Sequence, residues 1–213
     1  MTIGIRDHDL PSNTHNTYDV FFFDDTILTT VTHDPDTVSD WISEIMYIHR
    51  RRLHSLIVGL DVEWRPSFTR HYQNPVATLQ ICVGRRCLIY QLIHTRYIPD
   101  SLDDFLSDDD FTFVGVGVNP DLEKLDSDYG IGGEARAVEL GKRAADEYGR
   151  KELKNAGLKG LSSFVLGREM EKPRRVTTSR WDNRWLTAEQ VQYACIDAFV
   201  SFEIGRILNA SDY

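Results

Sequence analysis

The clearest pattern along the chain is an apolar stretch that ends in two acidic residues. Leu56 to Leu60 are apolar or glycine without a polar break, and Asp61 and Glu63 follow. Such a run is typical of a central strand covered on both faces. On a strand, side chains two residues apart share a face about 7 Å apart, and a divalent cation would offset the repulsion between two carboxylates. The alternative is a strand that ends in solvent with two incidental acids, because this pattern is common by chance.

The remaining pattern predicts a mixed series of strands and helices. Alternating or β-branched runs predict strands, and apolar residues at helical spacing predict helices. The expected elements are a hairpin of strands at 18–23 and 27–32, a helix from 34 to 49, strands at 76–83 and 87–90 around a tight turn, a short helix near 102–106, a strand at 111–118, a short strand within 135–140, helices at 140–148 and 158–166, and a long helix from 187 to 208. Residues 1–17 are polar, and we expect them to be flexible, with 18–213 forming a single domain.

Composition narrows the class of protein without identifying it. The chain has 213 residues, 41% of them hydrophobic and 27% charged, which is ordinary for a globular domain. We expect no membrane span, because no stretch of about 18 apolar residues occurs. The N-terminus does not resemble a secretory signal, and the three cysteines form no disulfide framework or metal-binding pair. An intracellular location, in the cytoplasm, the nucleus or both, fits best.

The formal net charge of −9 argues against a general nucleic-acid coat protein, which would be basic. It leaves room for an enzyme that clusters carboxylates around metal ions. One segment, 168–184, holds six basic residues against three acidic ones, and Trp181 and Trp185 lie among them. Basic residues mixed with aromatic ones suit a nucleic-acid backbone and its bases. The equally good alternative is a solvated loop whose tryptophans anchor it to the core.

Two further acidic residues, Asp121 and Asp197, lie on predicted helices. After the strand at 111–118, Asn119 is a good N-cap and Pro120 suits the first helical position, so Asp121 lies in the first turn. Its simplest role there is to interact with the helix dipole. On the last helix, Tyr193 and Asp197 are one turn apart. Small neighbouring residues predict close packing there, so we expect Asp197 to be largely buried and to need a partner.

Four carboxylates at element ends favour hard cations, Mg²⁺ or Mn²⁺, over soft metals. Two such ions a few ångströms apart stabilise the attacking and leaving oxygens of an in-line displacement at phosphorus. The glycines at 115 and 117 do not form a dinucleotide-binding motif, because Pro120 and Asp121 follow them.

Three motifs in this order resemble a known family. LDVEW (60–64), VGVGVNPDLEKL (114–125) and YACIDA (193–198) are similar to the three exonuclease motifs of the DEDDy 3′–5′ exonucleases, a DnaQ-like group, and most of all to the Werner-syndrome type. GLSSFVLGREMEKP (160–173) and residues 179–205 follow the same pattern, so the resemblance spans 53–208. It implies an α/β fold: a ribonuclease H-like mixed sheet flanked by helices, with an N-terminal β-hairpin.

The resemblance also implies roles for individual residues. Asp61, Glu63, Asp121 and Asp197 would bind two Mg²⁺ or Mn²⁺ ions, and Tyr193 would orient or deprotonate the attacking water. The enzyme would release nucleoside 5′-monophosphates from the 3′ end. We also expect nucleic-acid contacts from five residues: Trp64, Arg174, Arg175, Arg180 and Trp181.

The hypothesis is therefore a metal-dependent 3′–5′ exonuclease of short single strands, with RNA favoured as the substrate. The likeness to short plant Werner-like enzymes suggests RNA and, by analogy alone, a homo-oligomeric ring. A DNA exonuclease of the repair type is the second hypothesis. A non-catalytic nucleic-acid or protein-binding module is the third, although such a module has no physical reason to keep four costly acids together.

Overall fold

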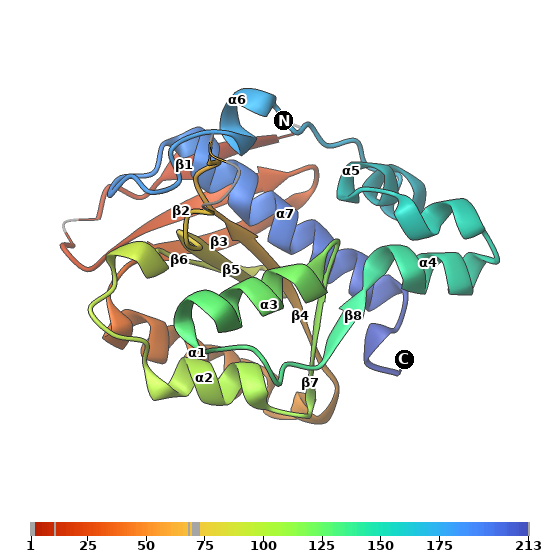
Figure 1. The fold of residues 1–213 in the computed structure, drawn as a ribbon, viewed down its shortest axis with the longest axis horizontal. Coiled ribbons are helices and arrows are strands. Elements are labelled where there is room, and N and C mark those ends of the chain that lie inside the picture. The colour runs from red at the N-terminus through yellow and green to blue at the C-terminus, as the bar shows by residue number, and fades with distance from the viewer. Residues whose placement is uncertain (1–2, 11, 68, 70–72, 213) are drawn as a thin grey trace.

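The computed structural model describes residues 3–10, 12–67, 69 and 73–212, and the strands of these residues form one eight-stranded mixed sheet (Figure 1). The sheet order is β1-β2-β3-β6-β5-β4-β7-β8. Its strands are β1 (Ile3–Asp7), β2 (His15–Phe22), β3 (Asp25–Thr32), β4 (Leu56–Glu63), β5 (Thr78–Val83), β6 (Arg86–Tyr90), β7 (Phe111–Gly115) and β8 (Ala137–Glu139).

The sheet has two antiparallel parts joined by a parallel pair. The strands β1, β2 and β3 are antiparallel, and β3 then runs parallel to β6. The strands β4, β5 and β6 form an antiparallel meander, and β7 and β8 continue from β4 in parallel. The predicted N-terminal hairpin and the predicted antiparallel turn at Gly84 are both confirmed, and that glycine has the positive φ of 59° that a tight turn needs.

The N-terminal segment differs from the sequence-based expectation. The sequence predicts a flexible 1–17, whereas Ile3–Asp7 forms an edge strand and β2 begins at His15. Ile3 and Ile5 are partly buried against the core. The alternation of apolar and polar residues that marks a strand is therefore present, but it extends over only a few residues. The polar composition around it hides that signal, because the hydrogen bonds that hold β1 come from β2 and not from local sequence.

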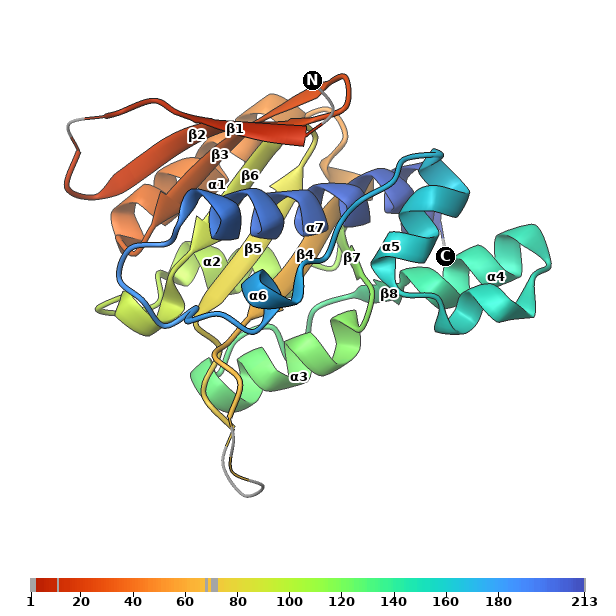
Figure 2. The same ribbon diagram turned by 90° about the horizontal axis from the view of Figure 1, so that it is seen from above.

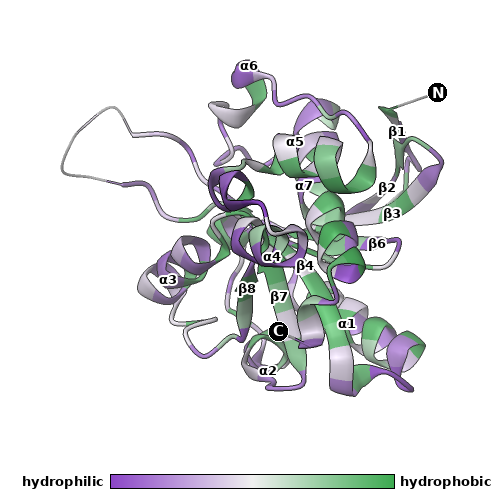
Figure 3. Cartoon of the chain, turned by 90° about the vertical axis from the view of Figure 1, so that its right-hand side faces the viewer, coloured by the Kyte–Doolittle hydropathy of each residue, from purple (hydrophilic) through white to green (hydrophobic). Residues whose placement is uncertain are grey.

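Helices cover both faces of the sheet (Figure 2). One face carries α1 (Pro35–His49), α2 (Asp100–Ser107) and α3 (Val118–Tyr129), whose apolar side chains share a core with alternate residues of β4, β5 and β7. The other face carries the remaining α-helices: α4 (Leu140–Tyr148), α5 (Leu158–Leu161), α6 (Arg174–Thr177) and α7 (Ala188–Ile207). In Figure 3 the green, hydrophobic residues gather on the sheet and α7, whereas α3 is largely purple. Alternation along the strands therefore sends side chains into two separate cores.

Short helical turns complete the chain. They are 3₁₀ turns at Leu53–Ser55, Leu92–His94, Lys151–Asn155 and Ala210–Asp212, and a π-helical turn at Ser162–Leu166 that continues α5. This turn ends at Gly167 with a φ of 63°, so the predicted helix end at this glycine is confirmed. Within the described residues, no helix is both long and apolar enough to cross a membrane.

The helix α7 packs very closely on β4. Thr187 and Gln190 form the predicted capping box at its start, which satisfies backbone N–H groups that the helix leaves free. A Cβ added to Gly59 would lie 2.0 Å from the carbonyl oxygen of Ala198, so only glycine allows this approach. Gly59 is two residues from Asp61 on the strand, and Ala198 is next to Asp197 on the helix. The close contact therefore brings the two elements together near these carboxylates.

The helix α3 begins earlier than the sequence predicts. Its N-cap is Gly117, with a φ of 79°, whereas the sequence predicts Asn119. The physical reason is the left-handed conformation of this glycine, whose N–H donates to both carboxylate oxygens of Glu139 at 2.9 and 3.0 Å. Asn119 therefore lies inside the helix, and Asp121 is in the first turn, as predicted.

Candidate active site

The strand β4 places its two acids on the face that α7 covers. Gly59, Asp61 and Glu63 alternate with Val58, Leu60 and Val62, which belong to the opposite core. Across the ladder, Asp61 pairs with Gln80 and Glu63 pairs with Thr78, and both of these β5 residues are fully buried. The predicted shared face of the two carboxylates follows directly from this register.

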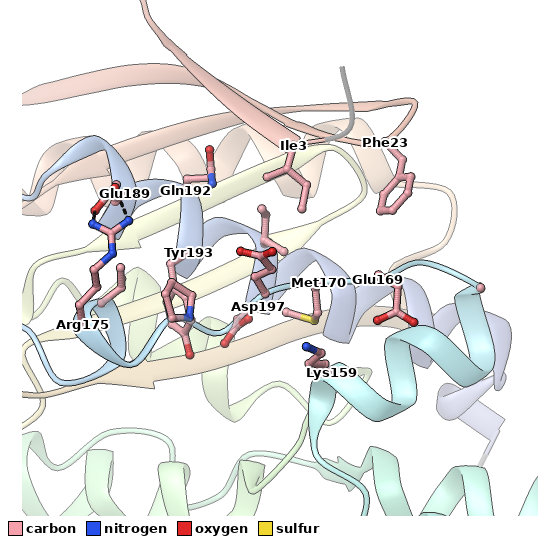
Figure 4. A pocket seen from close by; sticks show the side chains of 15 residues that line it. Ile3, Phe23, Lys159, Glu169, Met170, Arg175, Glu189, Gln192, Tyr193 and Asp197 are labelled. Atoms are coloured by element: carbon pink, nitrogen blue, oxygen red, sulfur yellow. Dashed lines mark hydrogen bonds and ion pairs between the residues drawn. The ribbon is translucent and has the colours of Figure 1, made fainter.

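The helix α7 contributes the third acid and the tyrosine. Asp197 is only 2% exposed, so its predicted burial is confirmed, and Tyr193 is 8% exposed one turn earlier. Figure 4 shows both side chains projecting from α7 towards the same pocket. The aromatic ring of Tyr193 packs against Trp181, with 6.1 Å between ring centroids, which holds the phenol in place.

The carboxyl groups destabilise each other's charged forms. Burial raises the pKa of Asp61 well above its ordinary value, and the charges of Asp197 and Asp121 raise it further. Burial, followed by the charges of Asp61 and Asp197, raises the pKa of Glu63 to about 10. Burial and the nearby Glu139 raise the pKa of Asp121 to about 7. These mutual effects place all four acids in one electrostatic cluster, which needs added positive charge or protons to be stable.

A lysine that the sequence motifs do not single out supplies part of that positive charge. The Nζ atom of Lys172 lies 2.5 Å from Oδ2 of Asp197 and 5.5 Å from the centre of the Tyr193 ring. Its positive charge also lowers the pKa values of Asp61, Glu63 and Asp121 against the effect of burial. Lys172 is the ion-pair partner that the predicted burial of Asp197 requires.

The donor set fits a hard divalent cation. Oδ2 of Asp61 and Oδ1 of Asp197 are buried and have no hydrogen-bond partner, which is costly unless a cation or a proton reaches them. Carboxylate oxygens are the ligands that Mg²⁺ and Mn²⁺ prefer. In the described part of the chain, however, no three side chains of the metal-binding types are already arranged to hold an ion. The chemistry of the cluster fits, and its side chains must adjust to coordinate a metal.

A pocket of about 770 Å³ adjoins the cluster. One wall is α7, which contributes Tyr193 and Asp197, and the opposite wall is the segment 167–176 (Figure 4). Ile3 and Phe23 close one end, so the N-terminal strands, which the sequence analysis leaves outside the site, form part of the pocket.

The predicted nucleic-acid contacts divide into exposed and buried residues. Arg174, Arg175 and Arg180 are exposed on the surface, and their role in binding a nucleic-acid backbone stays a prediction. Arg175 already forms a two-bond ion pair with Glu189, at 2.6 and 2.7 Å. Trp64 is half-buried, with Nζ of Lys124 5.3 Å from its ring centre.

Trp181 is the exception. Its side chain is 0% exposed, so the structure contradicts its prediction as a nucleic-acid contact. The alternative interpretation of the 168–184 segment, a loop anchored to the core by a tryptophan, describes Trp181, whose ring packs beside Tyr193. Trp185, by contrast, is 70% exposed. Sequence pattern cannot separate the two, because both tryptophans lie in the same polar stretch.

Three residues of the site were missed by sequence reasoning: Lys172, Glu139 and Gln80. Lys172 is only one of several basic residues in 168–184, and no local spacing distinguishes it. Glu139 reaches the site because β8 pairs with β7 in parallel, opposite Gly115. Gln80 is the one of the three that carries a signal in the sequence, because it interrupts the apolar run of a predicted strand. The structure shows it fully buried, and a buried amide needs hydrogen-bond partners.

The chain is similar in sequence to known exonucleases. The 3′–5′ exonuclease family model matches residues 30–211. A 3′–5′ exonuclease of Arabidopsis thaliana is 36% identical over 154 residues, which are 71% of this chain and 52% of that protein. The mouse bifunctional 3′–5′ exonuclease/ATP-dependent helicase WRN is 31% identical over 152 residues, 70% of this chain and 10% of that protein. The chain thus spans about half the length of the first relative and a small part of the second.

Solved structures share the fold at lower identity. The EXO domain of Aedes aegypti Nibbler has a TM-score of 0.67 at 18% identity, covering 85% of this chain and 87% of that one. Escherichia coli RNase D has a TM-score of 0.67 at 17% identity, and the match covers 85% of this chain and 44% of that one. These likenesses confirm the predicted α/β fold, a ribonuclease H-like mixed sheet flanked by helices.

Proposed function

The chain belongs to the 3′–5′ exonuclease family, and on that premise we propose that it is a metal-dependent 3′–5′ exonuclease of short single-stranded nucleic acid, with RNA favoured as the substrate. The observation that carries the proposal is the electrostatic cluster of Asp61, Glu63, Asp121 and Asp197 beside Tyr193. One strand and two helices that are far apart in sequence bring these side chains to one place. Without a cation, such a cluster only costs stability.

The four carboxylates are the groups that would hold Mg²⁺ or Mn²⁺. Bound there, two ions would stabilise the attacking and leaving oxygens of the displacement at the 3′-terminal phosphorus. Asp61 and Asp197 each offer a buried oxygen that has no other partner. Glu63 lies on the same strand face as Asp61, and Asp121 approaches from the first turn of α3.

Tyr193 acts on the attacking water by hydrogen bonding. Burial, followed by the charges of Asp197, Glu63 and Asp61, raises the pKa of Tyr193 far above its ordinary value. A phenol with a raised pKa keeps its proton at neutral pH, so it orients the water and does not deprotonate it. Its rigid packing against Trp181 keeps the hydroxyl aimed at the cluster.

The substrate backbone would follow the exposed arginines near the pocket. Arg174 and Arg180 have exposed side chains that would contact phosphates, and Arg180 also lies 3.6 Å from Asp182. The half-buried Trp64, with Lys124 over its ring, would add an aromatic contact to a base. Contacts of this kind do not depend on sequence, and they weaken as salt rises. A few such residues support a short single strand better than a long duplex on a chain of net charge −9.

The preference for RNA has weaker support than the reaction. It rests on the resemblance to short plant Werner-like enzymes, and contacts to the 2′-hydroxyl would have to produce it. The homo-oligomeric ring also stays a prediction. An intracellular location is proposed on the ground that Cys82, Cys87 and Cys195 are free, buried thiols.

The test is an end-labelled oligonucleotide assay with Mg²⁺ or Mn²⁺, comparing the wild type with Asp61→Ala and Asp104→Ala. Asp104 is an exposed acid on α2 and serves as the matched control. We expect a ladder of products shortened from the 3′ end, a loss of about 10²-fold or more for Asp61→Ala, and no loss for Asp104→Ala. Wild-type cleavage by Asp61→Ala would refute the mechanism.

The same assay separates the substrates. Ribo- and deoxyribo-oligomers of one sequence are compared at one salt concentration, because affinity depends on salt. Faster degradation of RNA supports the proposal, and faster degradation of DNA supports the repair-type alternative. If divalent ions changed neither activity nor thermal stability, the non-catalytic binding module would become the better explanation.

A further inference from the structure

Lys172 lies against the carboxylate cluster and forms an ion pair with one of its members. Its Nζ atom is 2.5 Å from Asp197, and its charge acts on Asp61, Glu63 and Asp121 as well. A third of its side chain is exposed, so the stem reaches solvent while the ammonium group lies at the acids. The ammonium group is therefore the cation that compensates these acids within the chain itself.

The segment that carries Lys172 is anchored on both sides. Four residues earlier, Arg168 binds Asp25 at 2.6 Å and stacks near Phe23, with 5.4 Å to its ring centre. Three residues later, Arg175 binds Glu189 through two hydrogen bonds. Lys172 is thus held at the cluster by a fixed backbone, while its own side chain keeps four flexible carbons.

A divalent cation needs the oxygens that this lysine holds. Oδ2 of Asp197 is bonded to Lys172, and only Oδ1 remains without a partner. This agrees with the finding that no three potential ligands among the described residues are already arranged around one point. An ammonium group and a metal ion cannot lie beside the same carboxylates at once without strong repulsion.

We propose that Lys172 is a resident counter-cation of the cluster: its ammonium group stabilises the acids in the free protein and competes with the divalent metal for Asp197. The proposal rests on the metal-dependent function proposed above and adds a residue to it. The metal displaces the lysine side chain, and the free energy needed for that displacement lowers the apparent affinity for the metal.

Two opposite effects follow from removing the charge. In Lys172→Met the free protein loses its counter-cation, so the acids repel each other and the metal-free melting temperature falls. The metal then has no competitor, so Mn²⁺ binds more tightly, and the rise in melting temperature that it causes is larger. A residue with a merely structural role would lower stability without tightening metal binding.

The experiment measures Mn²⁺ binding by calorimetry and melting temperatures with EDTA or with Mn²⁺, for the full chain and three variants. Lys172→Met is the test, and Lys172→Arg keeps the positive charge. Lys159→Met is the matched control, because Lys159 lines the same pocket and forms no ion pair with an acid in the part of the chain that the structure describes. We expect Mn²⁺ to bind Lys172→Met about tenfold tighter or more. The other two variants should stay close to the wild type.

Each alternative outcome is decisive. Binding to Lys172→Met that is equal to or weaker than binding to the wild type overturns this proposal and leaves the proposed function standing. If Lys159→Met tightened Mn²⁺ binding as much as Lys172→Met, the effect would come from the net charge near the pocket and not from the position of Lys172. That result also overturns the proposal. No Mn²⁺ binding to any of the proteins overturns the metal-dependent function together with this proposal. Should Lys172→Met fail to fold, tighter binding to Lys172→Arg than to the wild type contradicts the competition.

Discussion

Arg168 donates a 2.6 Å hydrogen bond to Asp25, and this ion pair joins two distant parts of the chain. Asp25 begins β3 in the N-terminal hairpin, and Arg168 begins the segment that leads to Lys172. Arg85, at the turn between β5 and β6, donates to the other oxygen of the same carboxylate at 2.8 Å. Asp25 therefore links the hairpin, the meander and one wall of the pocket.

The first prediction concerns the pH dependence of this link. Burial alone would raise the pKa of Asp25, but the hydrogen bonds from Arg168 and Arg85 outweigh it and leave the pKa below the ordinary 3.8. A carboxyl group with a lowered pKa adds stability above its unfolded pKa and loses it as pH falls through the folded value. The stability that Asp25 adds should therefore disappear below about pH 4.

Asp25→Asn is expected to lower the free energy of unfolding by about 1–3 kcal/mol at pH 7, because two charge-assisted hydrogen bonds are lost. The difference from the wild type should shrink as pH falls below about 4. Urea unfolding at several pH values measures both. The exposed neighbour Asp24 supplies the control Asp24→Asn, and a pH-independent difference between Asp25→Asn and the wild type would contradict the assignment.

The second prediction concerns the contact between α7 and β4. In Gly59→Ala the new Cβ would lie 2.0 Å from the carbonyl oxygen of Ala198 and 2.7 Å from the backbone nitrogen of Phe202. Both are backbone atoms, so the helix has to move away from the strand. We expect a loss of about 3 kcal/mol or more in urea unfolding, together with weaker catalysis, because Asp197 moves with the helix.

The control is Gly160→Ala in α5. There a Cβ would lie 3.8 Å from its nearest neighbour, the Cβ of Ala156, so it meets no obstacle. Alanine favours helix over glycine, and this variant should gain up to about 1 kcal/mol. A neutral effect of Gly59→Ala would show that α7 can shift without cost.

The sequence predicts most of the scaffold because its signals are local. The apolar run before Asp61 predicts a strand, the spacing of Thr187 and Gln190 predicts a helix start, and the structure has both. Asp61 and Glu63 share a face for the same reason, since alternation is a property of the strand alone. The small residues around Asp197 also predict that α7 packs closely against another element. They do not predict that this element is β4 at Gly59.

What the sequence does not predict depends on contacts between distant residues. Lys172 meets Asp197 only because the 168–173 segment crosses α7, and nothing in its neighbours differs from a solvated basic loop. Trp181 and Trp185 lie four residues apart in one polar stretch, yet one is fully buried and the other largely exposed. Ile3 joins the sheet through hydrogen bonds that β2 supplies. Tertiary packing decides each of these cases.

The third prediction separates the two tryptophans. Trp181→Ala removes a fully buried side chain beside Tyr193, so it should cost about 3–5 kcal/mol in urea unfolding. Trp185→Ala removes a side chain that is 70% exposed and should change stability by less than about 0.5 kcal/mol. A small effect of Trp181→Ala would contradict its role as a core anchor.

The fourth prediction tests the role of the Tyr193 hydroxyl. Tyr193→Phe keeps the ring that packs against Trp181 and removes only the group that would orient the water. We expect kcat to fall by about 10- to 100-fold, with KM and Mn²⁺ binding unchanged, because the loss is confined to the chemical step. Single-turnover cleavage of an end-labelled strand measures it, and Tyr148→Phe on the exposed end of α4 is the control. An unchanged kcat would assign the water to another residue, whereas a raised KM with constant kcat would place the hydroxyl in substrate binding.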